Sequence, residues 1–223
     1  LRQQRCDMRY SQDTNTFRIK KLLPLCALAV LIVLVQCKGK YGSVTDAEFS
    51  RYSLRDKILM VTKKRCPQSP AGFRELVQCV REQSTMENGY GSTYISEFSN
   101  ISNSATLKGS SKDIAFFFEF MFEASESGKW LFEFAIDAGI ASGCKIGDRE
   151  LWFSREDIWA LDNHSKAFTK EIQLDRGYHI FSLYGIEGCC DGKWRVRFKS
   201  PSMNEFKVIS SANMNIRSRY YTL

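Results

Sequence analysis

The sequence has few of the residues and motifs on which most enzymes depend. It contains only two histidines, His164 and His179, and none of its eight cysteines shows the C-x-x-C spacing of a zinc site. It also lacks the G-x-S-x-G, phosphate-loop and dinucleotide-binding fingerprints. We therefore predict a protein that is not an enzyme, with no catalytic residues, no metal ligands and no cofactor.

The sequence also lacks the features of a disordered chain or a nucleic-acid reader. Only four prolines occur among 223 residues, and 43% of the residues are hydrophobic, so we expect a folded protein. The formal net charge is +7, yet the basic residues do not form one block interleaved with exposed aromatics. Their densest runs, at 18–21 and 63–65, lie beside an apolar stretch and in a predicted helix. We exclude nucleic acid as a partner.

One apolar run, at residues 22–35, is flanked by lysines on both sides. Its length lies between that of a signal-peptide core and that of a membrane span. A polar arm at residues 1–16 precedes it and is retained in the chain, so we interpret residues 17–38 as a single transmembrane helix in the lipid bilayer.

The distribution of cysteines favours one orientation of this helix. Five of the eight cysteines lie beyond residue 60, where an oxidising compartment would let them pair. The lysines and arginines on the two sides of the span differ too little in number to decide. We expect the N-terminus inside and the folded domain on the outer, lumenal or intermembrane side of a cell or organellar membrane.

Residues 43–87 have the pattern of a short helical hairpin. Thr45 and Glu48 have the spacing of a capping box, and an apolar stripe follows. The prolines of CPQSP at 66–70 break the pattern, and a second helix is predicted at 71–86.

Cys66 and Cys79 bracket this break. A disulfide between them would staple the hairpin, and two unpaired buried thiols are the alternative. Residues 88–111, rich in Ser, Asn and Gly, are predicted to form a linker, and its first part is a loop or a first edge strand around 93–98. Glycosylation sequons begin at Asn100 and Asn163, and they matter only if the domain faces a secretory lumen or the outside.

From residue 112 the apolar residues alternate with a period of two, and aromatics become frequent. The fold class we predict is mainly β, an antiparallel β-sandwich over residues 112–210, followed by a tail at 211–223. The predicted strands lie at 114–123, 129–137, 150–153, 169–174, 178–187, 193–199 and 206–209. The first two, which flank the turn SESG, are expected to pair as a hairpin.

Three stretches of this domain resemble the protective-antigen-type β-sandwich, a lectin-like domain of fungal adhesins, glycosidases and bacterial surface proteins. They are GKWLFEFAIDAG at 128–139, Gly147-Asp148, and LDRGYHIFSLY at 174–184. The Gly-Cys-Cys-Asp-Gly turn at 188–192 resembles a variant in bacterial surface proteins. The resemblance covers about residues 112–210.

In sugar-binding members of that family, two successive aspartates hold a calcium ion that grips sugar hydroxyls. The resemblance implies that Asp137 and Asp148 contact a ligand, and it adds glycans to the expected partners. Ala138 replaces the second aspartate, which removes one of the oxygen ligands that calcium needs. Calcium is therefore not part of the prediction.

Cys189 and Cys190 are adjacent in a turn flanked by glycines. We expect one of them to pair with Cys144 and to staple two loops, which is a common use of cysteine in an oxidising compartment. The alternative is a redox-sensitive disulfide between the two neighbours, or a soft-metal site.

Three functions remain after these exclusions. The first is an accessory subunit, in which the span docks into a larger membrane complex and the sandwich binds its protein subunits. The second is a membrane-anchored surface adhesion or carbohydrate-binding module. The third is a hydrolase whose site no motif reveals. We favour the accessory subunit, with the surface module as the alternative.

Overall fold

A computed structural model describes residues 44–82, 88–156 and 167–221. The chain divides between Lys40 and Tyr41 into two units, and the first unit lies outside these ranges. The predicted transmembrane helix at 17–38 falls in that first unit, so it stays a prediction. Within the described ranges, no helix is long and apolar enough to cross a membrane.

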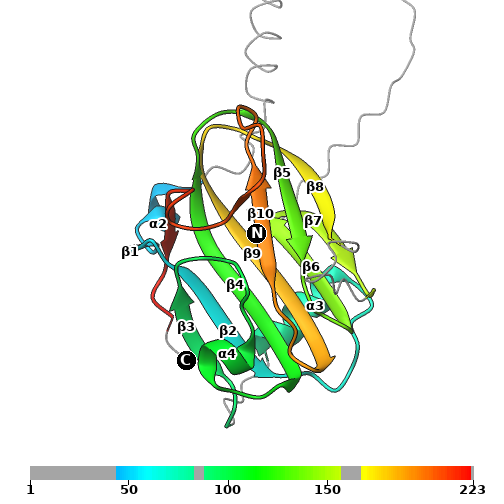
Figure 1. Cartoon of the computed structure of the whole chain (residues 1–223). Helices are drawn as coiled ribbons and strands as arrows, with labels where there is room; N and C mark the ends of the chain where they lie inside the picture. The colour runs from blue at the N-terminus through cyan, green and yellow to red at the C-terminus, as the bar shows by residue number, and fades with distance from the viewer. Residues whose placement is uncertain (1–43, 83–87, 157–166, 222–223) are drawn as a thin grey trace, which may run out of the picture. The chain divides into compact units, whose positions relative to one another are not determined.

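The described residues form a sandwich of two antiparallel sheets (Figure 1), as predicted. The larger sheet contains β1 (Leu54–Arg55), β2 (Ile58–Lys64), β3 (Gly91–Ile95), β4 (Lys112–Ala124), β6 (Ala141–Ile146), β7 (Arg149–Ser154), β9 (Gly177–Cys189) and β12 (Ile216–Ser218). The smaller sheet contains β5 (Gly128–Ala135), β8 (Phe168–Leu174), β10 (Arg195–Lys199) and β11 (Lys207–Val208). The larger sheet has the strand order β1-β12-β4-β9-β6-β7, and β2 pairs with both β4 and β3 beside this path. The smaller sheet has the order β11-β10-β5-β8.

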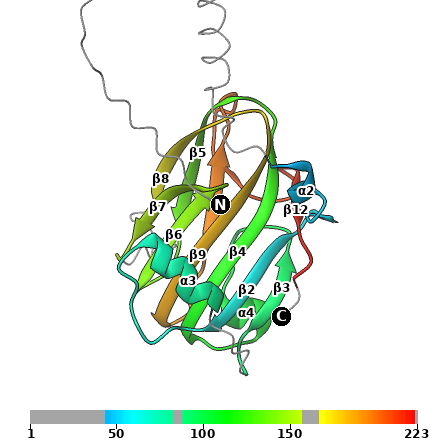
Figure 2. The ribbon, with the colours of Figure 1, turned by 180° about the vertical axis from the view of Figure 1, so that it is seen from behind.

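Three short helices accompany the sheets in the part of the chain that the structure describes: α2 (Asp46–Phe49), α3 (Phe73–Glu82) and α4 (Asn103–Leu107). The predicted capping box starts α2, because the Thr45 hydroxyl accepts from the Glu48 N–H and the Glu48 carboxylate accepts from the Thr45 N–H. Figure 2 shows α3 lying across the outer face of the larger sheet. There Leu76 and Val80 pack in a cluster with Phe117. The second predicted helix is thus confirmed over its described residues.

The first half of the predicted helical hairpin is wrong, because residues 58–64 form strand β2. This strand pairs with β3 on one side and with β4 on the other. Its residues from Ile58 to Lys63 are buried on both faces of the sheet. A strand that is buried on both faces does not alternate polar and apolar residues. The continuous apolar run of β2 was therefore interpreted as part of the apolar stripe of a helix.

The predicted linker at 88–111 and the predicted tail at 211–223 are also corrected. The former contributes β3 and α4, and the latter contributes β12, which pairs with β1 and β4. The possible edge strand around 93–98 overlaps β3, whereas α4 and β12 have only five and three residues and carry too little hydrophobic periodicity to be predicted.

The strands predicted between residues 114 and 209 are all present, and β6 is an additional strand. The predicted hairpin of 114–123 with 129–137 is wrong, because β4 pairs with β9 while β5 pairs with β8 and β10 in the other sheet. The two aromatic faces meet across the sandwich instead. Phe122 lies 6.1 Å from Trp130 and 6.0 Å from Phe132, measured between ring centroids. Because β4 and β5 lie in opposite sheets, their aromatic faces cover each other in the core. Two strands paired in one sheet would place these aromatics side by side on one face and would not cover them.

Candidate functional site

An open cleft of about 670 Å³ lies on the outer face of the larger sheet. Residues from α2, from the end of α3, from β4, β6 and β9, and from the segment after β12 line it. Figures 1 and 2 show α2 beside β12, and Figure 2 shows α3 over the same sheet. Pockets for small ligands commonly measure about 300–1,000 Å³, so the cleft has a suitable size.

The alternation of β4 places a carboxylate at the floor of this cleft. Phe118 and Phe120 point into the core between the sheets, whereas Phe117 and Glu119 point to the outer face. Helix α3 packs on Phe117, and Glu119 lines the cleft one alternation further along the strand. Glu119 is only 4% exposed, so its charge requires partners.

Two arginines and a tyrosine hold the Glu119 carboxylate. Arg81 Nη2 donates to Oε2 at 2.7 Å, and Arg219 Nε lies 2.7 Å from Oε1. The Tyr52 hydroxyl donates to Oε1 at 3.0 Å. Burial and the negative charge of Glu119 together raise the pKa of Tyr52. Two guanidinium groups therefore share one carboxylate.

Arg81 is fixed by the fold rather than by the carboxylate alone. Its Nε and Nη2 donate to the Tyr184 hydroxyl at 3.0 and 2.7 Å, and its guanidinium lies 5.5 Å from the centroid of the Phe117 ring. Lys63 Nζ donates to the Arg81 carbonyl at 3.3 Å. Burial, followed by the positive charge of Arg81, lowers the pKa of Lys63.

The lining of the cleft carries more positive than negative groups. Its cationic side chains are Arg51, Arg81, Lys145 and Arg219. Its carboxylates are Glu48, Glu119 and Asp148, so the cleft has a formal excess of one positive charge. Converging guanidinium, hydroxyl and carboxylate groups in a concave site can bind a polar ligand with hydrogen-bonding oxygens.

A second group of acidic residues lies further along β9. Asp137, Glu187 and Asp191 are 7%, 1% and 8% exposed. Asp191 caps the start of α4, because its Oδ1 accepts from Asn103 N at 2.7 Å and its Oδ2 accepts from Ser104 N at 2.6 Å.

The proximity of these acids changes the titration of Glu187. Its Oε1 accepts from a backbone N–H at 3.3 Å, but its Oε2 is buried without a hydrogen-bond partner among the described residues. Burial, followed by the negative charges of Asp137 and Asp191, raises the pKa of Glu187 to about 8. Glu187 is therefore mainly protonated at neutral pH.

This acidic cluster does not fit a calcium ion. Ala138, which follows Asp137, has no oxygen in its side chain, and this side chain is fully buried in the core. Both carboxylate oxygens of Asp191 already accept from the backbone of α4. Across residues 44–82, 88–156 and 167–221, no group of three or more His, Cys, Asp or Glu residues is arranged to hold a metal ion.

The two predicted ligand-binding aspartates lie at opposite ends of β6. Asp137 precedes this strand and meets Gly192, whereas Asp148 follows it and lines the cleft. β6 has six residues, so its length of roughly 20 Å separates the two sites. The structure does not bring Asp137 and Asp148 together.

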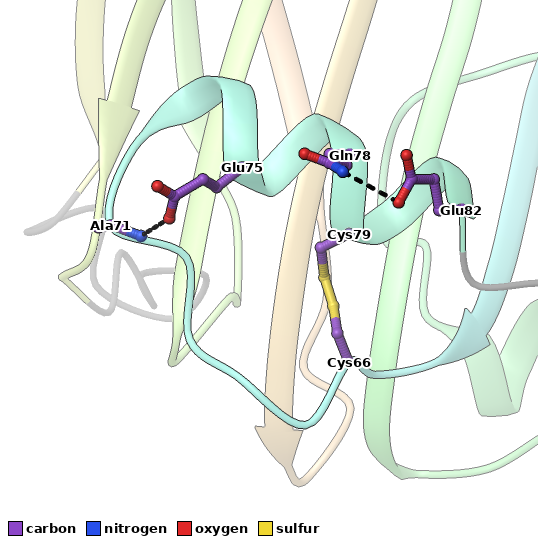
Figure 3. The surroundings of a disulfide bond; sticks show 6 residues. All are labelled: Cys66, Ala71, Glu75, Gln78, Cys79 and Glu82. Carbon is purple, nitrogen blue, oxygen red and sulfur yellow. Dashed lines mark hydrogen bonds between the residues drawn. A yellow bond between two sulfur atoms is a disulfide. The ribbon is translucent and has the colours of Figure 1, made fainter.

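The cysteine pairing is partly as predicted. Cys66 and Cys79 form a disulfide with a Cα–Cα distance of 5.9 Å, and this bond ties the loop before α3 to the helix (Figure 3). Figure 3 also shows Glu75 and Glu82 on the same helix. The Glu75 carboxylate accepts from the Ala71 N–H at 2.7 Å, which fixes the end of that loop.

The expected link between Cys144 and the Cys189-Cys190 turn is wrong. Cys189 and Cys190 are bonded to each other, and Cys144 is a buried free thiol whose pKa is raised by burial. Cys144 lies opposite Leu183, which is six residues before Cys189 on β9, so about 20 Å of strand separates the thiols.

The structure describes one of the two histidines and one of the two glycosylation sequons. His179 is buried, and its Nε2 lies 2.7 Å from the Asp175 carbonyl. Asn100 of the first sequon is exposed. His164 and Asn163 lie outside the described residues.

Comparisons with known proteins agree on the fold. No family model and no curated protein match the chain. The A domain of epithelial adhesin 9 from Candida glabrata, in complex with Galb1-4GlcNAc, is 11% identical with a TM-score of 0.53, and the match covers 80% of this chain and 94% of that one.

Two further solved structures are similar. The PA14 domain of the MpAFP antifreeze protein is 11% identical with a TM-score of 0.53, over 76% of this chain and 96% of that one. A subtype-switched epithelial adhesin 9 A domain from Candida glabrata, in complex with beta-lactose, is 12% identical with a TM-score of 0.50, over 80% and 92%. The chain thus has a lectin-like β-sandwich fold.

The residues that build the cleft were missed at the level of sequence. One signal was present, because Glu119 is the only charged residue between Ile114 and Phe122. A lone charge in a strand that is otherwise apolar must meet an opposite charge when the strand is buried. Its partners, Arg81 and Arg219, are 38 and 100 positions away in the sequence, so no local pattern connects them to Glu119.

Proposed function

We propose that this chain is a surface binding module for carbohydrate, without enzymatic activity, and that residues 17–38 anchor it in a membrane. The supporting observation is the similarity in fold to adhesin domains whose structures contain Galb1-4GlcNAc and beta-lactose. The sandwich would then be a variant of the protective-antigen type, distinguished by its Gly-Cys-Cys-Asp-Gly turn. Its N-terminal arm would lie inside and the sandwich outside or in a lumen.

The cleft on the larger sheet is the binding site in this proposal. It is open, and it offers charged and hydroxyl groups of the kinds that bind sugar hydroxyls. The acidic cluster at Asp137, Glu187 and Asp191 is at most 8% exposed, so its carboxylates have little surface to offer a sugar.

Binding in this proposal does not require calcium. Ala138 supplies no oxygen ligand, and both oxygens of Asp191 cap α4. The cleft contacts its ligand through side chains instead of through an ion.

The accessory-subunit function was the first choice from the sequence, and the similarity to adhesin domains favours the surface module instead. A β-sandwich also serves many roles, so the choice depends on a binding experiment.

The test is a glycan array probed with the detergent-solubilised full chain, once with calcium and once with EDTA. We expect a defined subset of glycans to be bound equally in both conditions. Failure to bind any glycan, with stoichiometric co-purification of other membrane proteins, would contradict the proposal and support the accessory subunit. Binding only with calcium would contradict the assignment of the site to the cleft.

A further inference from the structure

The cleft has a specific charge pattern that bears on its ligand. We infer that it selects a sugar that carries a carboxylate, and that Arg81 and Arg219 bind this carboxylate. The inference rests on the proposed carbohydrate-binding function and names the class of sugar.

The charge at the floor of the cleft is not balanced. Glu119 brings one negative charge, and Arg81 and Arg219 bring two positive charges within 2.7 Å of its oxygens. A ligand with one negative charge would neutralise the excess at the arginine pair, whereas a neutral sugar would leave it in place.

Both arginines have more N–H donors than their contacts with Glu119 and Tyr184 use. An arginine side chain presents five N–H groups in a planar fork that matches a carboxylate. Arg219 pairs with Glu119 through Nε at 2.7 Å, and its terminal nitrogens are not part of that ion pair. The Arg81 and Arg219 side chains are 39% and 32% exposed, although Glu119 between them is 4% exposed. Part of each guanidinium can therefore reach a ligand in the cleft.

The arginines are held in place before any ligand arrives. The Tyr184 hydroxyl and the Phe117 ring position Arg81, and Glu119 positions Arg219. Donors that are already oriented lose little conformational freedom on binding, which favours affinity. Around them, Asp148 and Lys145 also line the cleft, and they can bond to the hydroxyl groups of a sugar ring.

The test is an NMR titration of the detergent-solubilised full chain with three probes: sodium D-glucuronate, D-glucose and sodium acetate. We expect glucuronate to bind about tenfold or more tightly than glucose, because hydrogen bonds from guanidinium groups to a carboxylate are stronger than those between neutral groups. Acetate, which has the carboxylate without the sugar, should bind at least about tenfold more weakly than glucuronate.

Variants identify the arginine that carries the preference. Arg219→Gln should lose the preference for glucuronate over glucose, and Arg219→Lys should keep part of it. Arg197→Gln is the matched control, because Arg197 is 30% exposed and pairs with Glu133 on the smaller sheet, away from the cleft. It should leave both affinities unchanged. If Arg219→Gln unfolds, the comparison of Arg219→Lys with Arg197→Gln carries the test.

The outcomes that would overturn the inference differ from those that would overturn the proposed function. Equal binding of glucose and glucuronate would overturn the inference and leave the carbohydrate-binding function intact. Acetate binding as tightly as glucuronate would show an anion site without sugar recognition, which also overturns it. If none of the three probes binds, the inference fails, and the glycan array decides the proposed function separately.

Discussion

The cleft and the acidic cluster both bury carboxylates against the larger sheet, but they neutralise them in different ways. At the cleft, Glu119 lies between the guanidinium groups of Arg81 and Arg219. At the acidic cluster, Glu187 lies close to two other acids, and its pKa is raised to about 8, so a bound proton removes its charge. One region thus depends on opposite charge and the other on protonation.

This difference bears on function. The arginines of the cleft are about one-third exposed and leave positive charge facing solvent. The acids of the cluster are almost fully buried, and Asp191 holds the start of α4. Asp191 therefore has a structural role at the start of α4, whereas the open and charged surface lies elsewhere on the sandwich.

The largest effect is expected from removing the carboxylate at the cleft. Glu119→Ala should lower the free energy of unfolding by about 3–5 kcal/mol, because it leaves two guanidinium groups partly buried without their shared partner. The measurement is urea unfolding followed by tryptophan fluorescence. Glu171→Ala, which removes an exposed partner of Lys129, should cost no more than about 1 kcal/mol. Equal losses in the two variants would contradict the account of the cleft.

The two disulfides should differ in their contribution. Cys66–Cys79 closes a loop with a sequence separation of 13 and ties down α3, which carries Arg81, so replacing both cysteines with serine should cost about 3 kcal/mol. The same replacement of Cys189 and Cys190 beside the acidic cluster should cost only about 1 kcal/mol, because adjacent residues close almost no loop. Urea unfolding of the two double variants without reductant tests the difference, and the reverse order would contradict it.

The acidic cluster should make stability depend on pH in a defined direction. The pKa of Glu187 lies near 8 in the folded state, above its ordinary value of 4.5, so the folded state binds this proton more tightly. The stabilisation is complete below pH 4.5 and is lost as the pH rises toward 8. Between pH 5 and pH 8.5 we expect a loss on the order of 4 kcal/mol for this group, at about 1.36 kcal/mol for each unit of pKa difference.

The matching variant is Glu187→Gln, which keeps the shape and removes the titration. Its advantage over the unchanged protein should grow as the pH rises, measured by urea unfolding at several pH values. Glu171→Gln, at an exposed position, should follow the unchanged protein. An unchanged difference between Glu187→Gln and the parent across this pH range would refute the protonation of Glu187.

The sandwich was predictable from sequence where strands alternate and was missed where they do not. Strand β5 alternates half-buried and buried positions, and its alternating aromatic residues predict a strand. Strand β2 is buried on both faces, so its sequence does not alternate polar and apolar residues and does not identify it as a strand. The short turn between β4 and β5 suggested that these strands pair with each other. In the structure they belong to different sheets, and their aromatic faces meet across the core. This arrangement depends on how the two sheets pack, which the turn does not determine.

The candidate site was less predictable than the fold. The resemblance pointed to Asp137 and Asp148, and only Asp148 lines the cleft. The residues that give the cleft its charge come from separate elements, since Arg81 ends α3 and Arg219 follows β12. Such a site depends on tertiary contacts, and the sequence shows only its buried charge, Glu119, as an isolated departure from an apolar strand.

The most direct test of the account compares one variant in each region for binding of the same glycan. The glycan is the strongest ligand from the array, and the variants are Arg219→Gln in the cleft and Asp191→Asn in the acidic cluster, where asparagine keeps an acceptor for the cap of α4. The account predicts that Arg219→Gln weakens binding by about tenfold or more, while Asp191→Asn binds as the unchanged protein does. Loss of binding in Asp191→Asn with full binding in Arg219→Gln would contradict it and place the ligand at the acidic cluster.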